Sequence, residues 1–97
     1  MNQVKLAANL LEIQPLRHTP AGLPVVRLQM AHESRVIEAG LSRQVSMTLK
    51  AVALGDIALQ LANTPVGSAI QVVGFLAPQR QGSDRLVLHI QQLVQAN

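Results

Sequence analysis

Apolar and polar residues alternate over much of this chain, which is the period of a β-strand with one buried face. Over residues 25–32 and 44–50, apolar side chains fall mainly on every second position. These segments predict two antiparallel strands, each with one face in the core and one face in solvent. Two later segments, from about residues 68–76 and 85–94, are predicted to be strands as well.

The first predicted strand, at residues 4–13, changes phase in the middle. Its larger apolar residues are even-numbered up to Leu10, and odd-numbered from Leu11 to Ile13. Such a slip predicts a β-bulge, which lets one strand bend from one side of a barrel to the other.

One short helix is predicted from four apolar residues with the i, i+3, i+4, i+7 spacing of a single helix face. Asp56 near its start suits the helix dipole, and residues 63–65 are predicted to end it. The residues of the apolar face are Leu54, Ile57, Ala58 and Leu61.

The predicted order is therefore three strands, one helix and two strands, with a turn at residues 38–40 between the second and third strands. This is the chain order of the OB-fold, a five-stranded Greek-key barrel with its helix between strands 3 and 4. We predict an all-β protein of this fold, with residues 1–97 forming a single domain. Ligands usually bind such a barrel on the exposed face of strands 2 and 3 and on the loops after strands 1 and 4.

Composition argues for a binding protein and against an enzyme. The chain has no cysteine, and the sequence patterns of serine hydrolases, phosphate loops, dinucleotide folds and zinc proteases do not occur in it. Its three histidines, His18, His32 and His89, are too widely spaced to suggest a metal site, so no metal or cofactor is expected. His32 and His89 are expected to be structural. Without a signal-peptide pattern or a long apolar stretch, a soluble cytoplasmic protein is expected, with no membrane partner.

Charge is sparse: 13% of the residues are charged, against about 25% in an average domain, and the net charge is +3. Weakly charged strand edges favour self-association, so a homodimer is expected. The small positive excess permits contact with phosphates without requiring it. The only aromatic residue, Phe75, is expected in the core rather than in a base-stacking platform.

Basic residues occur on the solvated faces and loops where an OB barrel usually binds its ligand. They can follow a phosphate backbone, and the alternative is that they are ordinary surface charges. The candidate DNA-binding residues are Arg17, His18, Arg27, Arg43, Ser46, Lys50, Arg80 and Arg85.

Several short motifs, in order along almost the whole chain, resemble the primosomal replication protein N (PriB) family. That resemblance implies a dimeric OB-fold protein, related to single-stranded DNA-binding protein and without catalytic activity. Such proteins bind single-stranded DNA and the restart helicase PriA, help to reload the replicative helicase at stalled forks, and in some bacteria pass the complex to DnaT. The motifs are Pro15-Leu16-Arg17, Pro20-x-Gly22-x-Pro24, His32-x-Ser34, Glu38-Ala39-Gly40-x-x-Arg43-Gln44, Val66-Gly67-Ser68, Val73-Gly74-Phe75 and Leu86-Val87-Leu88-His89.

The sequence also departs from the family members that bind DNA strongly. Those members carry aromatic residues where this chain has Leu41 and Ser46, and basic residues where it has His18 and Glu33. We therefore predict weak binding through phosphates and a main role as a helicase adaptor. Two alternatives remain open: a general single-stranded DNA-binding protein, whose usual acidic tail is missing after the last strand, and an OB-fold scaffold without a nucleic-acid role.

Overall fold

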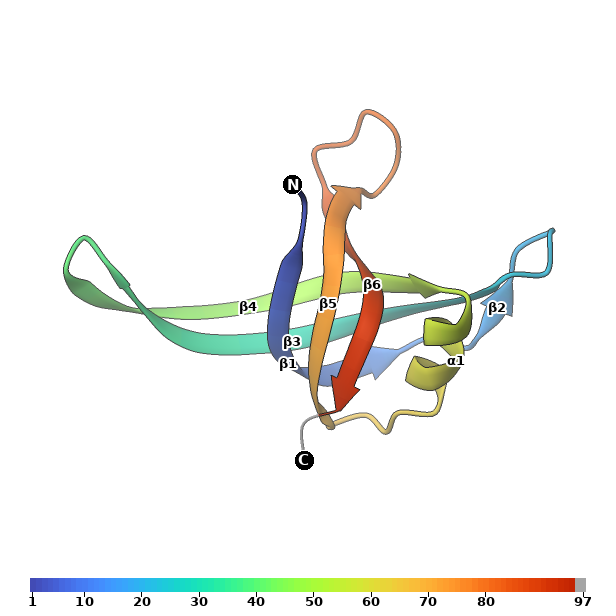
Figure 1. Ribbon diagram of the computed structural model, residues 1–97, viewed down its shortest axis with the longest axis horizontal. Coiled ribbons are helices and arrows are strands. Elements are labelled where there is room, and N and C mark those ends of the chain that lie inside the picture. Colours follow the sequence, from blue (N-terminus) through green and yellow to red (C-terminus); the bar gives the residue numbers. More distant parts are fainter. Residues whose placement is uncertain (96–97) are drawn as a thin grey trace.

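The computed structural model describes residues 1–95, and its strands curl into a closed barrel from which three loops project (Figure 1). The order along the sheet is β1-β5-β6-β4-β3-β2, and a further pairing of β1 with β3 closes the barrel. This confirms the predicted OB-fold. The elements are β1 (Val4–Ile13), β2 (Arg17–His18), β3 (Pro24–Glu38), β4 (Leu41–Leu54), α1 (Asp56–Ala62), β5 (Ala69–Pro78) and β6 (Leu86–Gln95).

The bulge predicted in the first strand is present, just after the strand changes its partner from β5 to β3. Residues from Val4 to Asn9 pair with β5, and from Asn9 onward β1 pairs with β3. The register with β3 shifts between Leu10 and Glu12. Because the first half of β1 pairs with β5 alone, its other backbone edge is left open.

The hairpin of β3 and β4 extends well beyond the barrel and forms an arm, at the left of Figure 1. Both strands are longer than predicted, because the residues of the arm have no core beneath them and so carry no regular apolar pattern. A two-residue turn joins the strands, with Ala39 and Gly40 at φ 52° and 78°. Two positive φ angles in succession are the geometry of a type I′ hairpin, whose twist matches that of the strands.

The helix is shorter than predicted and covers one end of the barrel, where it packs against β3, β4 and β6. Leu54, predicted to lie on its apolar face, is instead the last residue of β4 and is exposed. Gly55, at φ 83°, separates the strand from the helix. Ala58 and Leu61 are fully buried, as the predicted face requires. No helix within residues 1–95 is long and apolar enough to cross a membrane.

Aliphatic side chains and methionine form the core. Its largest fully buried side chains come from the strands and the helix, and they include Leu10, Met30 and Leu88. The prediction that Phe75 belongs to this core is wrong. Phe75 is half-buried outside it and stacks on His89 of the neighbouring strand, with ring centroids 4.9 Å apart.

A Gly74→Ala substitution is expected to destabilise the barrel strongly, because the paired strand β6 approaches closely here, beside a shift in the β5–β6 register. A Cβ on Gly74 would lie 1.9 Å from the carbonyl oxygen of His89, which is backbone and cannot rotate away. The expected loss is about 3 kcal/mol of unfolding free energy, measured by urea denaturation. Gly82→Ala, on an exposed loop with nothing nearby, is the control and should cost only about 1 kcal/mol. Equal losses for the two variants would contradict this account.

Candidate nucleic-acid interface

The pairing of β3 with β4 decides which side chains share a surface. Its register is unbroken from Val25, opposite Leu54, to Glu38, opposite Leu41. Side chains therefore alternate strictly between two faces along the whole hairpin. On one face, the side chains of Val26 and the residues in phase with it are buried in the core. We call the opposite face the outer face. It carries the odd-numbered residues of β3 and the even-numbered residues of β4.

Two of the candidate cations meet in a cavity on the outer face. The cavity has a volume of about 170 Å³, and both Arg27 and Lys50 line it. Gln29, which is directly opposite Lys50 in the sheet, lies in the same cavity. The complete lining is Glu12, Gln14, Arg27, Leu28, Gln29, Lys50, Ala51, Gln79 and Val87.

A third cation, Arg17, continues the line. Arg17 pairs with Val25, so it points to the same face as Arg27, and the two arginines line a second, smaller hollow. From Arg17 to Arg27 to Lys50, each step crosses one strand and advances two residues. With strands about 4.8 Å apart and a rise of about 3.3 Å per residue, each step covers about 8 Å. The three side chains form a diagonal row across β2, β3 and β4.

These cations are free of the acidic side chains around them. Within residues 1–95, the salt bridge between Arg43 and Glu38 is the single ion pair, at 2.7 Å. Arg17, Arg27 and Lys50 are all exposed. Their charges are therefore available to a ligand, and we call these residues the cationic diagonal.

The other candidate residues do not join this row. His18 pairs with Pro24 and Arg43 with Val36, so both point to the face opposite the cationic diagonal. Arg80 and Arg85 belong to the loop between β5 and β6, which projects at the top of Figure 1. The eight predicted residues thus do not form one site. They are spread over the barrel wall, the arm and the loops that project from the barrel.

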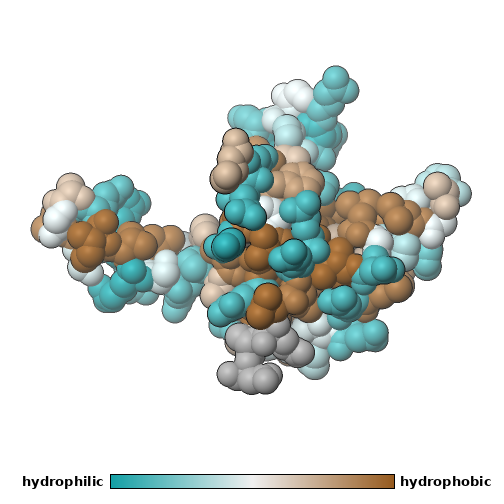
Figure 2. Space-filling model, in the orientation of Figure 1, coloured by the Kyte–Doolittle hydropathy of each residue, from teal (hydrophilic) through white to brown (hydrophobic). Residues whose placement is uncertain are grey.

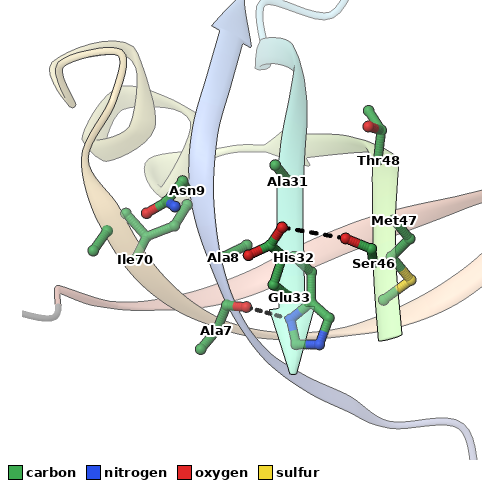
Figure 3. Close-up of a pocket in the computed structure, with 11 residues that line it drawn as sticks. Ala7, Ala8, Asn9, Ala31, His32, Glu33, Ser46, Met47, Thr48 and Ile70 are labelled. Carbon is green, nitrogen blue, oxygen red and sulfur yellow. Dashed lines mark hydrogen bonds between the residues drawn. The ribbon is translucent and has the colours of Figure 1, made fainter. Parts of the chain in front are cut away.

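Ser46, the last of the predicted residues, lines a larger groove between β1 and the arm (Figure 3). This groove has a volume of about 800 Å³. The Ser46 hydroxyl donates a hydrogen bond to the carboxylate of Glu33 at 3.3 Å. Ala7, Ala8 and Asn9 of β1 line the same groove.

His32 spans the groove from β3 to β1, which confirms its predicted structural role. Its Nδ1 lies 2.6 Å from the carbonyl oxygen of Ala7, and its Nε2 lies 2.8 Å from the hydroxyl of Ser34. Both ring nitrogens therefore have protein partners. No cluster of three potential metal ligands occurs among the residues that the structure describes.

Glu12 and Gln79 are residues of this surface that sequence analysis missed. Glu12 reaches the cavity because β1 pairs with β3 beyond its bulge, which puts it opposite Gln29. Gln79 reaches it from the base of the β5–β6 loop, where its backbone N–H donates to the carbonyl of Arg85 at 2.7 Å. Neither contact follows from local spacing, since both depend on how distant strands pair.

The fold and the family agree on the class of protein. Residues 2–92 match a family described as "Another single-strand binding protein family". The structure of the single-stranded DNA binding protein from Thermus aquaticus is similar in fold, with a TM-score of 0.79 at 24% identity. That comparison covers 100% of this chain and 50% of the other. The chain is thus of the single-strand binding type of OB-fold protein.

Closer relatives identify the family within that class. A replication restart protein PriB from Bordetella pertussis is 55% identical over 92 residues, which are 95% of this chain and 86% of the relative. The structure of PriB from Ralstonia solanacearum is similar to this one, with a TM-score of 0.90 at 33% identity. That comparison covers 100% of this chain and 99% of the other. The chain belongs to the PriB family of replication restart proteins. The names of these relatives are those of replication restart and binding proteins, not of enzymes.

Proposed function

We propose that this protein binds single-stranded DNA through phosphate contacts and assists the restart helicase PriA in reloading the replicative helicase. The observation that carries the proposal is the cationic diagonal, three exposed basic side chains in a row on the ligand face of an OB barrel. Such a row suits an extended polyanion, because successive phosphates can meet successive cations. We propose that the protein is a single OB-fold domain. Because its proposed work is on replicating DNA, its place would be the cytoplasm.

Binding is expected to be weak because the protein offers little for bases to stack on. Phe75 already stacks on His89, and the arm presents Leu41 and Ser46 rather than aromatic rings. Base stacking on an aromatic side chain contributes about 1–3 kcal/mol per base where it occurs. A strand held by phosphates alone exchanges readily, which suits an adaptor that passes DNA to PriA or, where one is present, to DnaT.

We also propose that two chains pair through the open edge of β1. That edge faces the groove of about 800 Å³, so a second chain has room to approach it. Ala7 on this edge is exposed and uncharged, and uncharged edge positions accept a further strand most readily. Two-fold pairing of identical edges closes the assembly at two copies.

Affinity for single-stranded DNA is expected to fall steeply with salt. Three phosphate contacts predict a slope of log K against log salt of about −2 for each protomer engaged. The measurement is fluorescence anisotropy of a labelled oligothymidine over a series of salt concentrations. Tight binding that hardly changes with salt would contradict a phosphate-based mechanism, and no binding at low salt would favour a scaffold without a nucleic-acid role.

The protein is expected to raise the ATPase rate of PriA on a forked DNA substrate severalfold. An adaptor that holds the strand loosely increases the local concentration of DNA at the helicase, with an effect that saturates as the complex fills. The measurement is the PriA ATPase rate at increasing concentrations of this protein. Inhibition at every concentration, as expected of a protein that sequesters DNA, would contradict the adaptor role.

An Ala7→Glu substitution is expected to weaken the dimer at least about tenfold. It puts a carboxylate on each of two paired edges, where like charges repel. Sedimentation equilibrium should show wild type at twice the mass of one chain, and the variant shifted towards a single chain. Gln71→Glu, on the β5 residue that pairs with Ala7, adds the same charge on the far side of β1 and serves as the control. A wild-type monomer at micromolar concentration would overturn the dimer proposal.

A further inference from the structure

The cavity between Arg27 and Lys50 differs from the hollow between Arg17 and Arg27, because it is larger and its wall contains an acid. We infer that this cavity holds one phosphodiester of the bound strand between the two cations, and that Glu12 in its wall limits the affinity. The inference rests on the proposed function and identifies the anchoring subsite within it. Local sequence does not group the residues of the subsite, since they come from β1 and the segment after it, β3, β4, β6 and the base of the β5–β6 loop.

The two cations are placed to act on one phosphate. Arg27 is two residues along β3 from Gln29, which is directly opposite Lys50. Their Cα atoms are thus about 8 Å apart on the same face, and both side chains line the same hollow. The guanidinium offers a planar pair of donors, and the ammonium adds a mobile point charge. A phosphodiester between them receives charge-assisted hydrogen bonds from both sides.

The size and lining of the cavity favour a phosphate over a base. Its volume of about 170 Å³ equals that of about six water molecules in the liquid, which suits a phosphate with part of its sugar. No aromatic side chain lines it, so a base would have no ring to stack on. Three glutamines, Gln14, Gln29 and Gln79, instead bring amide groups that can donate to phosphate oxygens.

Glu12 opposes the anion that the cations attract. It lies opposite Gln29, which lies opposite Lys50, so the three residues form one row across β1, β3 and β4. Two strand spacings separate Glu12 from Lys50, about 10 Å between their Cα atoms. Glu12 makes no salt bridge within the described residues. A phosphate between Lys50 and Glu12 would lie closer to the carboxylate than this, within the Debye length of about 10 Å at 0.1 M salt, so the repulsion between them is not fully screened.

The test is anisotropy titration of labelled oligothymidine at low salt with four single substitutions. Arg27→Gln and Lys50→Gln remove the two cations, and each is expected to weaken binding about fivefold and to reduce the salt slope by about 0.7. Glu12→Gln is expected to tighten binding about twofold. Arg35→Gln removes the same charge from an exposed position on the arm outside the cavity, and should change the affinity less than about twofold. Thermal denaturation checks that each variant is folded.

Competition experiments distinguish a phosphodiester of the strand from free phosphate. The pattern across the variants distinguishes failure of the anchoring subsite from failure of the proposed function. An oligonucleotide without bases should compete with oligothymidine nearly as well as an intact strand, whereas inorganic phosphate at the same phosphate concentration should compete poorly. Equal competition by inorganic phosphate would overturn the assignment to a phosphodiester of the strand. If wild type binds but Arg27→Gln and Lys50→Gln bind no more weakly than Arg35→Gln, the anchoring subsite alone is overturned. Unchanged affinity in Glu12→Gln would overturn the role of that carboxylate. No binding by wild type would contradict the proposed function itself.

Discussion

The structure depends on the change of partner along β1. This strand pairs with β5 up to Asn9 and with β3 from Asn9 onward, and the barrel closes through the second pairing. The change of partner leaves the first half of β1 with an open edge beside the large groove. Just beyond it, the register with β3 shifts between Leu10 and Glu12, which puts Glu12 opposite Gln29 on the outer face of β3. Closure, the open edge and the acid in the cavity therefore all depend on how this one strand pairs.

The unbroken register between β3 and β4 is the second constraint, and it acts on charge. Strict alternation puts Arg27 and Lys50 on the outer face and Arg43 on the other, where Glu38 neutralises it. A single-residue slip would exchange the two sets. The arm, by contrast, has apolar side chains exposed near its tip, Val36, Ile37 and Leu41, over the brown region at the left of Figure 2. The hairpin thus carries Arg27 and Lys50 on the barrel wall and its exposed apolar side chains near the tip of the arm.

The low charge and the single aromatic residue act together on binding. Without rings to stack bases, the proposed affinity for a strand would come from phosphates, and few cations are available to provide it. Glutamines that line the cavity are neutral, so they would orient a phosphate without adding to the charge. Under the proposed function, such a protein would hold a strand loosely enough to pass it on, which is the property that an adaptor for a helicase requires.

Alternation and phase in the sequence were sufficient to predict the strands, the bulge in β1, the helix and the OB-fold, because each follows from neighbours a few residues apart. The arm was underestimated, since its strands are held by cross-strand pairing without a core, and the helix face wrongly included Leu54 because periodicity cannot detect the break at Gly55. Residue type alone identified the cations but not their grouping. Only the tertiary structure decided that Arg17, Arg27 and Lys50 form one row and that Glu12 and Gln79 join them. Those contacts depend on strand register between segments far apart in the chain, which local sequence patterns do not encode.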